Sequence, residues 1–435
     1  MTTAANGQKT IGVLGALSIG VGGIVGGGFF ATFGLAIEGA RGGTPIAFLI
    51  GGAVALATAW SYVGLTLRYP GPGGTVAFLT TAYGRGLLPA SLSVLLVLSY
   101  VAVMSVYASA LASYTTAYLP EAMRSVAQHA IASAAILLLG LVNFAGARLM
   151  ERTEGVFNAG KLGVLGLFVV AGLLVGPLDW SRLEPAAWAP AQTLIATGML
   201  GFLAYEGFEL IANASGGIAE PRRTLPIAFL GSVAIAIAIY VLAFVVAIGH
   251  MSFAEVEASR DFAASEAASA ILGPVGFGIM TLGAVLASAS AINADYFGAA
   301  KLPALLSRDD DLPSRFQRQV RGQSIDSLLV IGAFALVAVN FLDIHALSAA
   351  TSGGFLLVFA AVNLAAIRLR AETATNPVLP AIALSLCLAA LALMVVQFLS
   401  SAATVASAIA IVAIVALSVA VELAFRAVYG RPRGG

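Results

Sequence analysis

The sequence predicts an all-α membrane protein with about twelve transmembrane helices. Of its 435 residues, 60% are hydrophobic and only 10% are charged, and the mean hydropathy is +0.97. Soluble domains carry about 25% charged residues, so this chain is too apolar to fold as a globule in water. Apolar stretches of about 20 residues, the length that spans a bilayer, recur along the chain. We therefore expect one membrane domain over residues 1–435.

The expected spans follow the apolar stretches in order. The first comes after a short polar N-terminus and is longer than the apolar core of a signal peptide, so we interpret it as a retained span. The expected ranges are 10–37, 45–67, 87–118, 129–147, 155–177, 192–214, 226–249, 272–300, 327–344, 346–367, 378–399 and 402–425.

The cations between the spans predict the orientation. With an N-terminus inside, seventeen of the 22 Lys and Arg residues fall on the cytoplasmic side, and Lys161 falls within a span. Positive charge concentrates in cytoplasmic loops, so we expect a multi-pass protein of the cell membrane with both termini in the cytoplasm. The outer loops carry only Arg41, Arg124, Arg182 and Arg260.

Composition also excludes several partners. The net charge of +1 argues against nucleic acid. The single cysteine, Cys387, permits no internal disulfide. His129, His250 and His345 lie far apart without metal-ligand spacing, so we expect no metal and no cofactor.

The first span contains a glycine-rich segment. Six of the eleven residues from 20 to 30 are glycine, and each costs up to about 1 kcal/mol relative to alanine in a helix. One interpretation is close packing of two helices through small residues. The other is an unwound segment, which a membrane tolerates only where the backbone lines a cavity or is buried by protein.

The sixth span carries Glu206 and Glu209 on either side of Gly207. A charge inside a membrane costs about 3 kcal/mol on insertion scales and usually faces a polar cavity. Alternatively, both carboxyl groups are neutral and bonded to neighbouring helices. Interrupted spans at matching places, five apart, predict an inverted-repeat transporter with its site near the midplane. The broken ends would offer N–H groups to a carboxylate and carbonyls to an ammonium, and an α-amino acid carries both groups.

Lys161 is the only charged residue between Glu154 and Asp179. Its amine could extend to the nearby interface, or it could lie inside the bundle, where desolvation would make its protonation switchable. In the eighth span Ser288 and above all Ser290 are candidate hydroxyl partners, although small polar residues also serve helix packing.

Several segments, in order along the whole chain, resemble the amino acid–polyamine–organocation (APC) superfamily of amino acid permeases. The most specific is the segment leading into the seventh span, which is similar to the family's short basic loop. The segments are Gly26-Gly27-Gly28-Phe29-Phe30, Lys161-Leu162-Gly163-Val164-Leu165, Gly207-Phe208-Glu209 and Ala219-Glu220-Pro221-Arg222-Arg223-Thr224-Leu225-Pro226.

The resemblance implies a five-plus-five inverted repeat, with repeats at about 10–177 and 192–367 and extra helices at about 378–425. It implies that substrate binds between spans 1, 3, 6 and 8, and that Lys161 occupies the place of the sodium ion of relatives, against the span 1 carbonyls from Gly22 to Ile24. The implied substrate-binding residues are Ile24, Gly26, Gly27, Gly28, Tyr107, Tyr205, Glu206, Gly207 and Glu209, and the implied proton-coupling residues are Lys161, Gly23, Ser288 and Ser290. Glu206 stands where most relatives have an apolar residue.

These features predict a secondary transporter that couples amino acid uptake to protons by alternating access. Exchange without net proton movement remains an alternative, followed by a channel or a receptor. We do not expect an enzyme, because the three histidines fall at span ends or in loops and the membrane interior offers no Asp–His pair. The expected partners are an amino acid, the proton and the lipid bilayer. No feature of the sequence selects one amino acid or an oligomeric state.

Overall fold

The computed structural model describes residues 10–145, 147–302, 319–320, 323–400, 402 and 404–429. Seven of the seventeen cations assigned to the cytoplasmic side therefore lie outside the described residues: Lys9, Arg308, Arg315, Arg318, Arg321, Arg431 and Arg433. Nearly all of the rest is helical. The main helices are α1 (Val13–Ile24), α2 (Gly27–Ala40), α3 (Thr44–Arg68), α4 (Gly74–Tyr83), α5 (Leu87–Thr116), α6 (Glu121–Ala145), α7 (Ala147–Leu174), α8 (Ala191–Leu200), α9 (Leu210–Ala214), α10 (Pro221–His250), α11 (Phe253–Ala258), α12 (Ala263–Ala299), α14 (Ile325–Phe341), α15 (Ile344–Arg368), α16 (Arg370–Thr373), α17 (Val378–Leu399) and α18 (Val405–Tyr429).

The predicted fold class is confirmed. Among the described residues, ten helical segments are long and apolar enough to cross a membrane. The pair α1 and α2, bent by 46°, forms an eleventh span. The 17-residue α14 is apolar and overlaps most of the predicted range 327–344. A two-residue antiparallel ladder joins β1 (Gln319–Val320) to β2 (Gln323–Ser324) just before α14.

The helix boundaries differ from the predicted ones mainly where polar residues extend a helix beyond its apolar core. The span expected at 129–147 begins at Glu121, because the first two turns of α6 are polar and still helical. The span expected at 272–300 begins at Ala263, and non-helical Gly273 (φ 64°) kinks it beside Pro274. The short helices α4 and α11 escaped prediction because neither is long enough to give a membrane-span signal.

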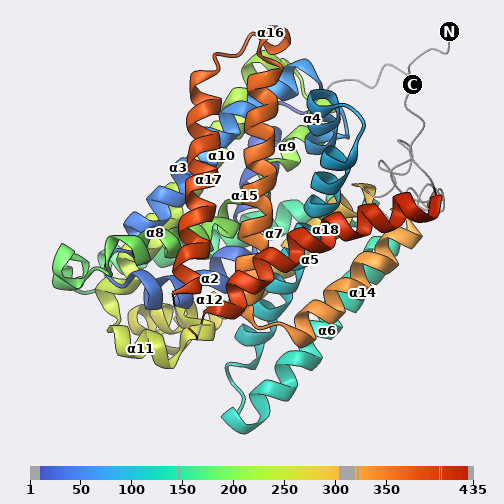
Figure 1. The fold of residues 1–435 in the computed structure, drawn as a ribbon. Helices are drawn as coiled ribbons and strands as arrows, with labels where there is room; N and C mark the ends of the chain where they lie inside the picture. The colour runs from blue at the N-terminus through green and yellow to red at the C-terminus, as the bar shows by residue number, and fades with distance from the viewer. Residues whose placement is uncertain are drawn as a thin grey trace.

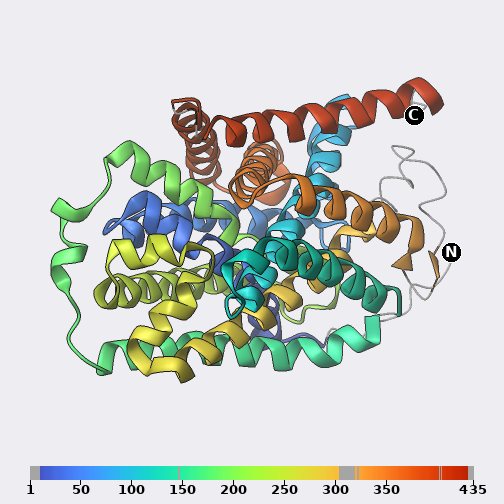
Figure 2. The ribbon, with the colours of Figure 1, turned by 90° about the horizontal axis from the view of Figure 1, so that it is seen from below.

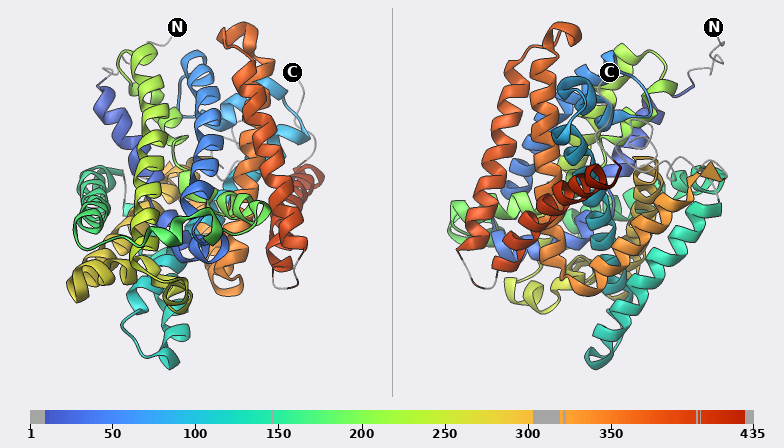
Figure 3. Two further views of the ribbon diagram at one scale, coloured as in Figure 1. Left: turned by 90° about the vertical axis from the view of Figure 1, so that its left-hand side faces the viewer. Right: turned by 45° about the vertical axis from the view of Figure 1, so that its right-hand side comes forward.

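The helices form one bundle with two distinct ends (Figure 1). We call the end with α4 and α16 the α4 face, and the opposite end with α11 the α11 face. Seen along the bundle, α7 and α18 lie on opposite sides, with the other long helices between them (Figure 2). Figure 3 shows that α18 is inclined to its neighbour α17 rather than parallel to it.

The α4 face joins the start of the first span to the end of the sixth. The Ile11 N–H donates to the Gly217 carbonyl (3.1 Å), and the Ala219 N–H donates to the Ile11 carbonyl (2.9 Å). The Gly71 N–H, just before α4, donates to the Ser215 hydroxyl (3.0 Å). The two spans that were predicted to be interrupted are therefore tied together at this end.

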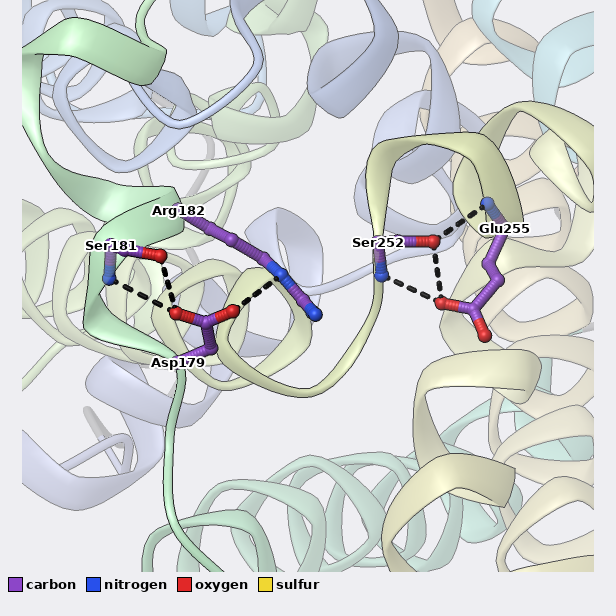
Figure 4. Close-up of polar contacts among 5 residues, drawn as sticks. All are labelled: Asp179, Ser181, Arg182, Ser252 and Glu255. Carbon is purple, nitrogen blue, oxygen red and sulfur yellow. Dashed lines mark hydrogen bonds and ion pairs between the residues drawn. The ribbon is translucent and has the colours of Figure 1, made fainter.

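The loops at the α11 face carry local side-chain contacts (Figure 4). Asp179 Oδ1 accepts from the Ser181 hydroxyl (2.5 Å), and Asp179 Oδ2 pairs with Arg182 Nε (3.0 Å). At the start of α11, Ser252 and Glu255 form a capping box in which the Ser252 hydroxyl donates to Glu255 Oε2 (2.7 Å). Hydrogen bonds from Ser252 lower the pKa of the Glu255 carboxyl group below its ordinary value. These contacts order the loops over this end of the bundle.

Candidate functional site

The first span is interrupted between α1 and α2. Helix α1 ends at Ile24, Val25 leaves helical geometry (ψ 72°), and α2 starts at Gly27. Gly26 precedes α2 in an extended conformation and has no side chain to cap the helix. The first N–H groups of a helix have no partner within it, so this end of α2 can bind an anion.

The interruption is shorter than the glycine pattern predicted. Gly20, Gly22 and Gly23 lie within regular α1, and only residues 25–26 leave the helix. A Cβ on Gly20 would lie 2.6 Å from Ser232 Oγ, and one on Gly23 would lie 2.7 Å from the Gly207 carbonyl oxygen. The two interpretations of the glycines therefore apply to different residues: those of α1 allow close packing, and those after it allow the break.

The sixth span breaks at the predicted place. A 3₁₀ turn (Gly201–Tyr205) follows α8, and Glu206 is extended (ψ 157°). Gly207 has φ 107°, which side-chain-bearing residues rarely adopt, and α9 resumes at Leu210. Two carboxylates and a required glycine are thus placed at a discontinuity inside the membrane domain.

The two breaks touch each other. The Tyr240 hydroxyl of α10 lies 3.0 Å from the Ile24 carbonyl oxygen and 3.0 Å from the Ala204 carbonyl oxygen, so one side chain connects both broken ends. Sequence reasoning missed Tyr240, because a tyrosine inside an apolar span carries no signal of its own.

Two further helices complete the wall beside the first break. A Cβ on Gly27 would lie 2.8 Å from Ser288 Oγ of α12 and 2.9 Å from the Tyr107 ring of α5. One on Gly26 would lie 2.9 Å from Ala291 Cβ of α12. Spans 1, 3 and 8 therefore meet at the start of α2, where the resemblance implied a site.

Lys161 lies inside the protein rather than at the interface. It is fully buried, and its Nζ donates to the Gly22 carbonyl oxygen (2.6 Å) in the last turn of α1. Ser288 Oγ is buried without a hydrogen-bond partner among the residues that the structure describes, so the expected bond from Lys161 to this hydroxyl is not formed here. Ser290 is also buried in α12. The amine thus contacts the broken span one turn before the break.

The buried carboxyl groups differ in their partners. Glu209 Oε1 accepts from the Tyr100 hydroxyl (2.9 Å), and its Oε2 accepts from the Gly207 N–H (2.8 Å). Glu206 is 3% exposed, and in the described part of the chain neither of its oxygens has a hydrogen-bond partner. A third carboxyl group, that of Asp295 in α12, is 8% exposed and interacts electrostatically with Glu209 and Lys161. Asp295 lies inside the predicted span 272–300, so its charge within an apolar stretch is a signal that could have pointed to it.

The Tyr205 side chain points from the break of the sixth span towards α3. Its hydroxyl donates to the Phe48 carbonyl of α3 (2.8 Å), and its ring packs against Phe48 and Tyr240. The Tyr205 side chain thus anchors the 3₁₀ turn to α3.

A cavity of about 290 Å³ lies between the breaks and the α4 face. Its walls come from α1, α9 and α12 and include Ile19, Leu210, Asn213, Phe297 and Gly298. On the opposite side the Tyr114 hydroxyl donates to the Phe30 carbonyl of α2 (3.2 Å), and Arg260 pairs with Glu38 (3.5 Å). This cavity thus lies towards the α4 face, and the two contacts lie towards the α11 face.

Discontinuous helices that meet in mid-bundle, with buried ionisable groups beside them, define the class of membrane carriers that bind their cargo at such breaks. A family model described as amino acid permease matches residues 11–424, and the chain belongs to this family. It is a transporter of amino acids or related small molecules.

Individual relatives agree with the family. The inner membrane transport protein YbaT of Escherichia coli is 31% identical over 387 residues, which cover 87% of this chain and 88% of the relative. The methylthioribose transporter of Bacillus subtilis is 23% identical over 87% of each chain. The human large neutral amino acids transporter small subunit 2 is 28% identical over 71% of this chain and 59% of its own length.

Proposed function

We propose that the protein carries an amino acid together with a proton across the cell membrane by alternating access. The observation that carries the proposal is the contact between the buried Lys161 ammonium and the Gly22 carbonyl oxygen (2.6 Å). A protonated amine satisfies this carbonyl at the end of α1. A neutral amine would bind it more weakly, because hydrogen bonds from charged donors are about twice as strong.

Protonation would in this way control the broken span. The last carbonyls of a helix have no partner within it, and Gly22 lies just before the break. When Lys161 loses its proton, the end of α1 loses a charged donor and is freer to move relative to α7 and α12. A helix end that depends on one proton is a two-state element, which is the physical requirement for coupling.

The substrate would lie across the breaks. The Gly26 N–H already donates to the Ile24 carbonyl (2.8 Å), so the N–H groups of Gly27 and Gly28 would bind the substrate carboxylate at the start of α2. The extended backbone at Glu206 and Gly207 would face its ammonium group. Tyr107 and Ser288 lie against Gly27 and would border the same space. The unpartnered Ser288 hydroxyl is available to either the substrate or Lys161.

The charge distribution supports a cytoplasmic α4 face and cytoplasmic termini. All four cations assigned to the outer loops lie near the α11 face: Arg41 lies over the Phe253 ring (4.9 Å) and Arg124 over the Phe262 ring (5.3 Å), while Arg182 and Arg260 form the ion pairs described above. Because positive charge concentrates in cytoplasmic loops, the opposite end faces the cytoplasm. The cavity would then be the inner vestibule.

Substitution of Lys161 tests the proposal. Purified wild type is first screened by thermal shift against the twenty amino acids, since a bound ligand raises the apparent stability. The best ligand is then used for uptake into proteoliposomes with an imposed pH gradient. We expect Lys161→Ala to abolish accumulation, whereas Gly163→Ala in the same helix, where a Cβ meets nothing within 4 Å, leaves it intact.

Two outcomes would contradict proton coupling. One is full pH-driven accumulation by Lys161→Ala. The other is wild-type counterflow that persists without a pH gradient, with no accumulation when one is imposed, which would identify an exchanger.

A further inference from the structure

Glu206 is a buried carboxyl group for which the described residues provide no hydrogen-bond donor. It lies at the break of the sixth span, 3% exposed, and both oxygens lack a hydrogen-bond partner among the described residues. A buried carboxylate is unfavourable unless it is paired and hydrogen-bonded, so this position requires either a neutral acid or a bound cation.

The neighbouring acids have their own partners. Glu209 accepts hydrogen bonds on both oxygens, from the Tyr100 hydroxyl and the Gly207 N–H. Asp295 interacts electrostatically with the Lys161 ammonium, although its Oδ2 has no hydrogen-bond partner among the described residues. Glu209 and Asp295 both interact electrostatically with Glu206, and they add negative potential at its carboxyl group instead of offsetting it. The environment of Glu206 therefore favours a positive group beside it.

Glu206 lies beside the proposed substrate space. Its carboxyl group interacts electrostatically with Tyr107, whose ring lies against Gly27 at the start of α2. A substrate whose carboxylate is bound at Gly27 would thus extend past Tyr107 towards Glu206.

The geometry is better suited to an organic cation than to a metal ion. Metal sites need several ligands, and no group of three or more His, Cys, Asp or Glu residues in the described part of the chain could hold one. A single carboxylate with two unoccupied oxygens suits an ammonium or a guanidinium, which binds through directed N–H donors.

We propose that Glu206 recognises a second, side-chain cation of the substrate, and that the protein therefore prefers cationic amino acids to neutral ones of the same length. This inference rests on the proposed amino acid transport and assigns its substrate class. The break between α1 and α2 would bind the α-carboxylate, and the break between α8 and α9 would bind the α-ammonium group. The Glu206 carboxylate would neutralise the positive charge at the end of the substrate side chain.

A matched pair of ligands tests the proposal. L-Lysine and L-norleucine have the same chain length and differ in the terminal amine. Their affinities are measured by ligand-induced thermal shift on purified full-length protein, and by competition for uptake into proteoliposomes. We expect the wild type to bind lysine at least about tenfold more tightly than norleucine. Glu206→Gln, which keeps the side-chain shape, should reduce that ratio to near one, and Glu206→Asp should restore part of it.

Three results would overturn the inference: a wild type that binds norleucine as tightly as lysine, a ratio unchanged in Glu206→Gln, or no lysine-dependent shift at all. Each would indicate a neutral, structural Glu206. Lys161→Ala separates this inference from proton coupling, because it should lose pH-driven accumulation while it keeps the lysine-to-norleucine ratio. A wild type that shows the ratio but no proton coupling would refute only the coupling.

Discussion

Replacing Tyr240 by phenylalanine removes the hydroxyl that connects the two broken spans and leaves the ring. The Ile24 carbonyl would keep its bond from the Gly26 N–H (2.8 Å), whereas the Ala204 carbonyl would lose the Tyr240 donor. A buried hydrogen bond contributes about 1 kcal/mol net, and up to about 3 kcal/mol when its loss leaves a buried acceptor unsatisfied. We therefore expect Tyr240→Phe to destabilise the protein by about 1–2 kcal/mol.

Tyr296→Phe is the matched control. Tyr296 also donates one buried bond to a backbone carbonyl, that of Ile136 (3.2 Å), but it does so between α12 and α6 and not between the breaks. Both variants should lower the apparent melting temperature by similar amounts. Only Tyr240→Phe should weaken substrate binding, because the breaks it connects form the proposed site. If about 1 kcal/mol of the loss appears in binding, the dissociation constant rises about fivefold.

The assay is thermal melting of both variants with and without a saturating amino acid, followed by titration. Equal affinities in the two variants, with equal losses of stability, would refute the reasoning, because the hydroxyl would then act only as packing. A wild-type melting temperature for Tyr240→Phe would show that the hydrogen bond from the Tyr240 hydroxyl does not contribute to stability.

The other predictions concern the glycines and the α11 face. Gly27→Ala should abolish uptake, because its Cβ would lie against Ser288 Oγ and the Tyr107 ring at the start of α2. The variant should still elute as a folded protein in size-exclusion chromatography. Uptake at the wild-type rate would contradict this prediction. Ser252→Ala should lower the melting temperature at pH 7, since such caps contribute about 1 kcal/mol. Hydrogen bonds from Ser252 lower the pKa of Glu255 below its ordinary value of 4.5. The stability that the ionised Glu255 contributes is therefore present above about pH 4.5 and is lost as the pH falls through the folded-state pKa. Solvent screening keeps this contribution to stability small. A melting-temperature difference between wild type and Ser252→Ala that grows on acidification would contradict the role of the Glu255 carboxylate.

Much of the fold followed from the apolar stretches, because a membrane restricts spanning segments to helices of a narrow length range. The sixth span shows how far local chemistry reaches: two carboxylates and a glycine in an apolar stretch predicted a break, and Gly207 with φ 107° lies within it. The first span shows the limit. Composition could not decide which glycines pack and which unwind, since that depends on the neighbours, such as Ser232 against Gly20.

The parts of the site that the sequence did not predict come from tertiary contacts. Tyr240 and Tyr205 look alike in sequence, yet one connects the two breaks and the other anchors α3. Asp295 lay inside a predicted span, but its position near Lys161 depends on how α12 packs against α7. The orientation of side chains between spans is fixed by packing, which hydropathy does not record.

The central claim is that the two breaks together bind the substrate, and a structure of the protein with its bound amino acid tests it most directly. We predict a ligand whose carboxylate lies against the N–H groups of Gly27 and Gly28 and whose α-ammonium group lies beside the backbone at Glu206 and Gly207. A ligand bound only in the cavity lined by Asn213 and Phe297, with the start of α2 unoccupied, would contradict it.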